Sequence, residues 1–268
     1  MANEIDKGSD LYLNLLKTTL LGSIYPGLDG YVWPGSYPLR WLMYKLFPSD
    51  VVFFRRMSTK MRGLTWPSHA YSMVGPNRLD NIRFCLEDTI KNNVPGDFIE
   101  TGVWRGGSCI FARAVLKTNG ITDRKVWVAD SFEGLPKPDR EKYPADAGDR
   151  HFLIPELAVS MEQVQENFRT FDLLDNQVQF LKGWFKDTLP KAPFQKLAVA
   201  RLDGDLYEST MDALSSLYSK LSVGGYLIVD DYGAVPACKK AIHDYRDANG
   251  IKDRLQEIDI SGVFWQKT

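Results

Sequence analysis

Short apolar runs alternate with helical patterns from about residue 95 to the end of the chain. The runs are rich in β-branched residues and have the length of single strands; they cover residues 97–103, 125–130, 177–182, 197–203 and 226–231. Helical spacing of apolar residues separates them, at about 108–118, 160–171, 208–221 and 235–249. This alternation predicts an α/β fold with a doubly wound, mostly parallel sheet covered by helices on both faces. Ligands of such sheets bind at the carboxyl ends of the strands.

The two ends of the chain depart from this alternation. Residues 254–266 have the pattern of two strands around Ser261-Gly262, which predicts an antiparallel C-terminal hairpin and a sheet of six or seven strands. Helical patterns before residue 95 lie at about 10–22, 39–47, 50–61 and 77–92, with a turn-rich stretch from 25 to 38. We therefore divide the chain into a helical extension or cap, residues 1–94, and an α/β domain, residues 95–268. The extension would serve as a lid or an oligomer contact.

The composition removes several classes of protein. The formal net charge of −1 provides no overall field that attracts nucleic acid. Three well-separated cysteines without a Cys-x-x-Cys motif argue against a disulfide framework and a structural zinc site. The acidic N-terminus does not resemble a secretory signal, and the longest apolar stretch near it, residues 11–25, is too short to span a bilayer. A cytoplasmic protein is the expectation.

The first predicted strand ends in a glycine-rich loop that begins with an acid. The loop reads Glu100-Thr-Gly-Val-Trp-Arg-Gly-Gly-Ser108, in which the glycines let the backbone approach a ligand and Ser108 can cap the next helix. It lacks the middle glycine of the dinucleotide fingerprint. The acid suits a cation such as S-adenosylmethionine better than a pyrophosphate. The predicted cofactor contacts are therefore Glu100, Thr101, Gly102, Val103, Trp104 and Ser108.

The second predicted strand ends in Asp130, which Ser131 and Phe132 follow. A carboxylate in this position can accept hydrogen bonds from both hydroxyls of a ribose. Asp130 lies 30 residues after Glu100, a usual length for one strand–helix–strand unit. Together with the glycine loop, this acid favours a nucleoside ligand, so Asp130, Ser131 and Phe132 join the predicted cofactor contacts.

Four carboxylates follow the fourth and fifth predicted strands, in Asp203-Gly-Asp205 and in Asp230-Asp231. They should converge at one edge of the sheet, where they repel one another unless a cation joins them. Oxygen ligands without histidine or cysteine favour magnesium, calcium or manganese over zinc. We assign Asp203, Asp230 and Asp231 as ligands of Mg²⁺ or Mn²⁺, with Asp203 also a cofactor contact. Asp205 is assigned as the general base for an acceptor hydroxyl.

The charges of the site support this assignment of a metal, and one condition must hold for it. Three ligand carboxylates, one divalent ion and one sulfonium together carry no net charge, which suits methyl transfer inside a dry site. The condition is that the aspartates converge and are not occupied by lysine or arginine partners; otherwise the interpretation as an enzyme fails with the metal site.

These segments together resemble the macrocin O-methyltransferase (TylF-like) family, which methylates sugar hydroxyls of macrolide and aminocoumarin natural products. The resemblance covers roughly residues 66–268 and is carried by residues 100–113, 126–132, 183–188, 203–205 and 230–232. It implies a Rossmann-like class I methyltransferase fold, a divalent metal and a homodimer or higher homo-oligomer. It also implies that Ser72 and Met73 contact the methionine end of the cofactor. Gly183, Trp184 and Phe185 would flank the adenine, on which aromatic rings can stack.

Two further features bear on the acceptor. The irregular stretch from 133 to 155 is long enough to form a lid, within which His151 would contact the substrate or assist proton transfer. Residues 30–62 are rich in aromatic side chains, and between positions 40 and 62 they include six basic residues and one acidic residue. This segment would form a lid or subunit contact, line a pocket for a bulky acceptor or, as the least favoured interpretation, touch a membrane surface.

The sequence therefore predicts a metal-dependent O-methyltransferase that moves a methyl group from S-adenosylmethionine to a sugar hydroxyl of a secondary metabolite. Its acceptor would be a small glycosylated molecule with a vicinal diol. The same chemistry on a catechol, a polyketide or a peptide-linked hydroxyl is the alternative, because variable loops select the acceptor. A metal-dependent glycosyltransferase with Asp203-Gly-Asp205 as its Asp-x-Asp motif is less favoured, since the acidic loop suits a diphosphate poorly. A nicotinamide-dependent oxidoreductase and a non-catalytic cofactor-binding protein are disfavoured further.

Overall fold

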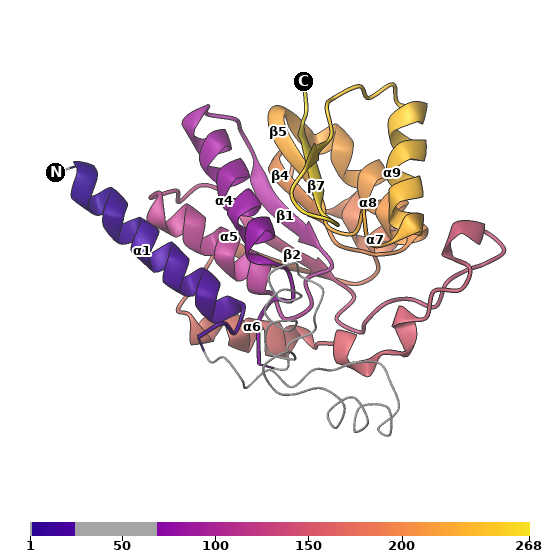
Figure 1. The fold of residues 1–268 in the computed structure, drawn as a ribbon, viewed down its shortest axis with the longest axis horizontal. Coiled ribbons are helices and arrows are strands. Elements are labelled where there is room, and N and C mark those ends of the chain that lie inside the picture. Colours follow the sequence, from indigo (N-terminus) through magenta and orange to yellow (C-terminus); the bar gives the residue numbers. More distant parts are fainter. Residues whose placement is uncertain (1, 25–68) are drawn as a thin grey trace, which may run out of the picture.

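A computed structural model of the chain describes residues 2–24 and 69–268. Within them, one seven-stranded sheet is covered by helices on both faces (Figure 1). The helices predicted at 39–47 and 50–61 and the aromatic, basic segment 30–62 lie outside the described residues. No described helix is both long enough and apolar enough to cross a membrane.

The strands run in the spatial order β3-β2-β1-β4-β5-β7-β6. The first five in the chain pair in parallel, and β7 pairs antiparallel with both β5 and β6. Their bounds are β1 Asp97–Thr101, β2 Val126–Asp130, β3 Val178–Lys182, β4 Leu197–Leu202, β5 Leu221–Val229, β6 Gln256–Glu257 and β7 Val263–Gln266. The predicted doubly wound sheet with a C-terminal antiparallel hairpin is confirmed. The fifth strand begins earlier than predicted, because glycines at 224 and 225 interrupt its β-branched pattern.

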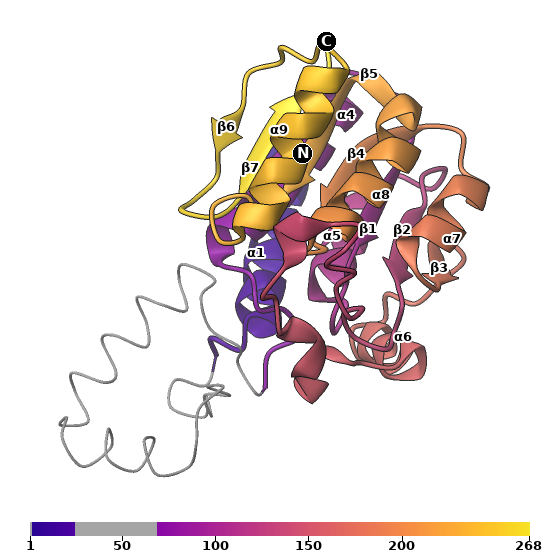
Figure 2. The same ribbon diagram turned by 90° about the vertical axis from the view of Figure 1, so that its right-hand side faces the viewer.

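The helices form two groups on opposite faces of the sheet (Figure 2). Each group packs on the sheet through its own hydrophobic core. On one face lie α4 (Pro76–Lys91), α5 (Gly107–Thr118) and α6 (Met161–Thr170), with α1 (Ala2–Leu20) packed against α4 and α5. On the other lie α7 (Phe185–Thr188), α8 (Tyr207–Leu217) and α9 (Pro236–Ala248). The buried stripe of α1, Leu13, Leu16 and Leu20, has helical spacing and enters the same core as α5. The domain boundary at residue 95 stays a prediction.

The carboxyl ends of the parallel strands form the functional edge of this sheet. From β1 the chain proceeds to β2 and β3 on one side, and β4 and β5 lie on the other. The crevice at such a switch point is where ligands of doubly wound sheets bind. In Figure 1 the strand arrowheads point toward the long connection between β2 and α6.

This connection is folded rather than irregular. It contains three 3₁₀ turns, Pro144–Asp146, His151–Leu153 and Pro155–Leu157. The buried carboxylate of Asp146 accepts hydrogen bonds from the backbone N–H groups of Tyr207 (2.6 Å) and Glu208 (3.1 Å), and so caps α8. The connection is thereby fixed across the strand ends, and its action as a lid stays a prediction.

Candidate active site

The glycine loop after β1 lies against the loop after β4. Gly102 has a φ of 86°, and a Cβ on it would lie 1.7 Å from the carbonyl oxygen of Asp203. Only glycine allows this approach. Gly106, with a φ of 82°, takes the N-cap position of α5. The predicted capping role of Ser108 is therefore wrong: Ser108 lies inside the first turn of α5, where it is buried.

Asp130 joins the loops after β1 and β2. Its carboxylate accepts hydrogen bonds from the backbone N–H groups of Val103 and Phe132, both at 2.7 Å, and from the Ser131 hydroxyl at 3.3 Å. Burial raises the pKa of Asp130, and these hydrogen bonds oppose the rise. Each carboxylate oxygen has more than one lone pair, so acceptors remain for ribose hydroxyls.

A pocket opens beside Asp130 and brings together nine of the predicted cofactor and catalytic residues. They are Met73, Gly102, Trp104, Asp130, Ser131, Trp184, Phe185, Asp203 and Asp205. The pocket thus joins the aromatic pair after β3 to the acids after β4. That an adenosine lies at one end and the chemistry at the other stays a prediction.

The remaining predicted cofactor contacts lie outside the lining of that pocket. They are Ser72, Glu100, Thr101, Val103, Ser108, Phe132 and Gly183, and all except Gly183 are buried. The segment that carries Ser72 nevertheless lies along the start of α5, because the N–H of Gly107 donates to the carbonyl of Tyr71 at 3.0 Å. Their contacts with the cofactor stay predictions.

Replacing Asp130 with alanine should weaken S-adenosylmethionine binding by about 10- to 100-fold, since the ribose loses charged hydrogen-bond acceptors. Titration calorimetry on the full chain measures this change. Asp97→Ala is the matched control. Asp97 also accepts two N–H groups, from the backbone of Lys125 and the indole of Trp127, at the opposite edge of the sheet. An equal loss of affinity in both variants would contradict the ribose role.

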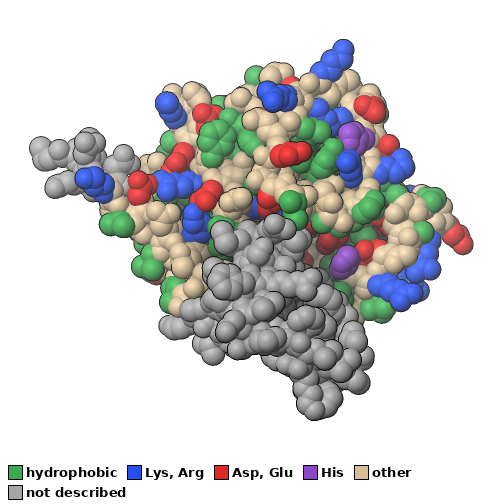
Figure 3. Space-filling view, viewed as in Figure 1, with side chains coloured by type: hydrophobic (Ala, Val, Ile, Leu, Met, Phe, Trp, Pro, Cys, Tyr) green, Lys and Arg blue, Asp and Glu red, His purple; other side chains and the backbone are tan. Residues whose placement is uncertain are grey.

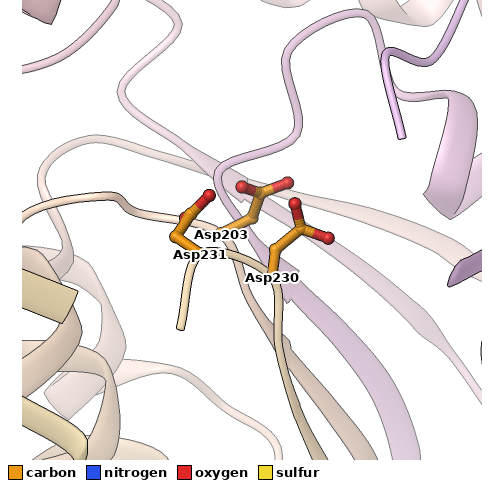
Figure 4. A group of neighbouring side chains, drawn as sticks. All are labelled: Asp203, Asp230 and Asp231. Carbon is orange, nitrogen blue, oxygen red and sulfur yellow. The ribbon is translucent and has the colours of Figure 1, made fainter. Parts of the chain in front are cut away.

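The aspartates after β4 and β5 converge. Figure 4 shows the carboxylates of Asp203, Asp230 and Asp231 pointing to the same side, beyond the strand ends. One ligand atom from each lies within 4.8 Å of the others. The two predicted ligand segments therefore meet, and their all-oxygen donor set fits a hard divalent cation.

The second half of the condition set by the sequence is not met, because two arginines occupy part of this cluster. The buried guanidinium of Arg201 donates to Asp203 at 2.7 Å and pairs with Asp230 and Glu100. Arg78, from α4, pairs with the other oxygen of Asp230. Glu100 thus directs its carboxylate toward Arg201 and the Cys109 thiol, which donates to it at 2.8 Å.

Among the described residues, acids outnumber the arginines at this edge. Four carboxylates pair with the two guanidiniums, those of Glu100, Asp203, Asp230 and Asp259. Asp205 and Asp231 lie beside these acids and repel them. Burial, followed by neighbouring acids, raises the pKa of Asp205 to about 7 and that of Asp231 well above its usual range. Burial likewise raises the pKa of Glu100 to about 7, against the opposing charge of Arg201. An additional cation is the natural partner for such a cluster.

Two residues beside the cluster hold special positions. Asp205 adopts a left-handed backbone conformation, with a φ of 55°, and its N–H donates to Asp231 at 3.2 Å. His151 lies near enough for its charge to lower the pKa of Asp205. Its Nδ1 is 2.6 Å from one carboxylate oxygen of Asp149, and the other oxygen accepts the His151 backbone N–H at 2.9 Å. The structure therefore brings His151 toward the predicted base.

The chain has the fold of the class I methyltransferases: a seven-stranded sheet of this order, with a glycine loop after β1 and an aspartate at the end of β2. Sequence comparison narrows the class: the profile of the macrocin-O-methyltransferase (TylF) family matches residues 9–267, and the chain belongs to that family. It is an S-adenosylmethionine-dependent O-methyltransferase. The match begins well before residue 66, so the predicted extent of the resemblance was too short.

Two relatives and one solved structure illustrate the similarity. The chain is 49% identical to demethyldecarbamoylnovobiocin O-methyltransferase of Streptomyces niveus, over 100% of this chain and 97% of the relative. It is 50% identical to 8-demethyl-8-(2,3-dimethoxy-alpha-L-rhamnosyl)-tetracenomycin-C 4'-O-methyltransferase of Streptomyces olivaceus, over 97% and 93%. The solved structure of the O-methyltransferase NovP superposes with a TM-score of 0.86 at 49% identity, covering 97% of this chain and 99% of that one. Membership of this family excludes the glycosyltransferase and oxidoreductase alternatives.

Proposed function

We propose that the protein methylates a sugar hydroxyl of a small glycosylated natural product, in antibiotic or related biosynthesis, with the help of a divalent metal ion. One observation carries the proposal: carboxylates from two neighbouring strand ends converge beside the pocket that contains Asp130. The relatives support the sugar acceptor, because the tetracenomycin enzyme is named for a substrate with a rhamnosyl group.

The cofactor end of the pocket binds and orients the donor. S-adenosylmethionine supplies an electrophilic methyl group on a sulfonium. Asp130 accepts the ribose hydroxyls, Trp184 and Phe185 flank the adenine, and Met73 and Gly102 border the methionine end. The other predicted contacts lie behind this lining and would support it by packing; they are Ser72, Glu100, Thr101, Val103, Ser108, Phe132 and Gly183. Holding donor and acceptor in line accounts for a large part of the rate enhancement.

The acidic end of the pocket activates the acceptor. Asp203, Asp230 and Asp231 would hold Mg²⁺ or Mn²⁺, which lowers the pKa of an acceptor hydroxyl nearby. Asp205 accepts the proton of that hydroxyl, since it lines the pocket next to these ligands. His151, oriented by Asp149, contacts the acceptor from the connection between β2 and α6.

Removal of divalent ions tests this function. With a panel of glycosylated and phenolic acceptors, we expect transfer of the methyl group to a sugar diol in Mg²⁺ and a drop of at least about 100-fold in EDTA, since metal activation supplies several kcal/mol. Mg²⁺ should restore the activity, and Asp231→Asn should abolish the restoration. Activity that is unchanged by EDTA removes the metal role, and methylation of phenols alone removes the sugar acceptor.

We also propose that the protein works in the cytoplasm as a homodimer or higher homo-oligomer. The three cysteines are free and buried, which fits a reducing compartment. On the face in Figure 3, basic and acidic side chains are interspersed, as expected for a protein whose ligand is a small molecule rather than nucleic acid. Light scattering after size exclusion decides the oligomeric state, and a monomer would contradict this part.

A further inference from the structure

Among the described residues at the functional edge of the sheet, Arg201 has the most deeply buried charged side chain. It lies on β4, opposite Glu100 of β1 in the sheet register, and its side chain has 0% exposure. One guanidinium therefore reaches carboxylates from three neighbouring strands: Glu100 on β1, Asp203 after β4 and Asp230 after β5. A buried arginine in a strand requires such partners, and its planar fork can bind several of them at once.

Arg78 reaches the same cluster from the helical layer. Its side chain is 5% exposed, donates to Asp259 at 2.8 Å and pairs with Asp230. Arg201 uses one oxygen of Asp230 and Arg78 uses the other. Asp203, by contrast, accepts from Arg201 through only one oxygen. The three candidate ligands therefore differ in how freely they can bind an ion.

We propose that Arg201 and Arg78 are positioning residues for the metal site: they hold Asp203 and Asp230 in place without a divalent ion and compete with that ion for Asp230. The inference rests on the proposed divalent site. It predicts a protein that folds without metal and binds the ion weakly and exchangeably, unlike sites whose folding depends on the metal.

The charges agree with this division of roles. The two arginines are matched by two carboxylates that are not candidate ligands, Glu100 and Asp259. Among the described residues of the cluster, Asp203, Asp205, Asp230 and Asp231 are then left as an excess of acids, which a divalent ion and a sulfonium would offset. Burial lowers the pKa of Arg201, but Asp230, Asp203 and Glu100 raise it by more, so the guanidinium stays charged.

Arg78→Gln tests the competition. In calorimetry with MnCl₂ on the metal-free full chain, we expect the Kd for Mn²⁺ to fall by roughly tenfold, because Asp230 loses one positive partner. Arg83→Gln is the matched control on the same helix. Arg83 pairs with Asp10 and Glu87 away from the cluster, so its removal should leave the Kd unchanged.

Arg201→Gln tests the positioning. Its Tm in EDTA should fall by about 6–20 °C, the usual effect of leaving a buried ion pair without one partner, and MnCl₂ should restore about half of that loss. Arg113→Gln is the control, since Arg113 is also buried but pairs with Asp175 far from the cluster. Its Tm should fall and show no recovery with MnCl₂.

The outcomes separate the two proposals. Wild-type protein that binds no Mn²⁺ overturns the metal site of the proposed function. Wild-type protein that binds Mn²⁺ with the same Kd as Arg78→Gln overturns the role of the arginines alone, as does an equal loss of Tm in Arg201→Gln with and without MnCl₂. If Arg201→Gln does not fold, the Kd of Arg78→Gln decides.

Discussion

Replacing Asp205 with asparagine should lower kcat by roughly 10²- to 10⁴-fold, the usual contribution of a general base. The change removes the proton acceptor and keeps the shape of the side chain. Asparagine also tolerates the left-handed conformation, with a φ of 55°, that the backbone adopts here. Steady-state kinetics with the preferred acceptor, together with calorimetry for Mn²⁺ and S-adenosylmethionine, separates turnover from binding.

Stability provides the control for Asp205→Asn. Burial and the charge of Asp203 raise the pKa of Asp205 to about 7, so a neutral side chain relieves repulsion. The Tm should therefore stay equal or rise while kcat falls. A parallel loss of Tm and of metal affinity would contradict the assignment and make Asp205 a ligand instead.

His151→Gln should reduce kcat by a smaller factor, about tenfold, and a His151→Gln variant with wild-type kinetics would remove that residue from the site.

The fold was predictable because its main signals are local. Five strands and the helices between them each show their hydrophobic pattern within one short stretch of consecutive residues. An example is β4, whose six residues are all buried. The signal failed where glycine interrupted it, at the start of β5. It also failed to locate the cap of α5, since Gly106 takes the N-cap by its left-handed backbone and not by a side chain.

The acids of the site were predictable for the same reason, but their partners were not. Asp203 and Asp230 stand directly at strand ends, and the rules of parallel sheets bring them together. The sequence shows one indication of Arg201: it is the single charged residue inside the apolar run Leu197–Leu202, and a charge buried there requires a buried partner of opposite charge. Arg78 and Asp146 show no such indication, because each acts on an element far away in the chain.

Gly102 connects the two halves of the site, and its replacement tests that connection most severely. In Gly102→Ala the new Cβ would lie 1.7 Å from the carbonyl oxygen of Asp203, so the loops after β1 and β4 must separate. We expect a loss of more than about 4 kcal/mol of unfolding free energy, as in the most damaging substitutions, and a fall in Tm of at least about 8 °C. S-adenosylmethionine, which should raise the Tm of the wild-type protein, should leave that of Gly102→Ala unchanged.

Gly120→Ala isolates the steric part of this effect. Gly120 also has a left-handed backbone, with a φ of 67°, but a Cβ there meets no atom within 4 Å. Its replacement should cost only about 1–2 kcal/mol, the price of the backbone conformation, and should keep the response to the cofactor. If both variants respond alike, the contact between Gly102 and Asp203 has no special role. If only Gly102→Ala loses the rise in Tm with S-adenosylmethionine, the glycine loop and Asp203 depend on the same backbone contact. The donor site and the acceptor site are then positioned by one contact.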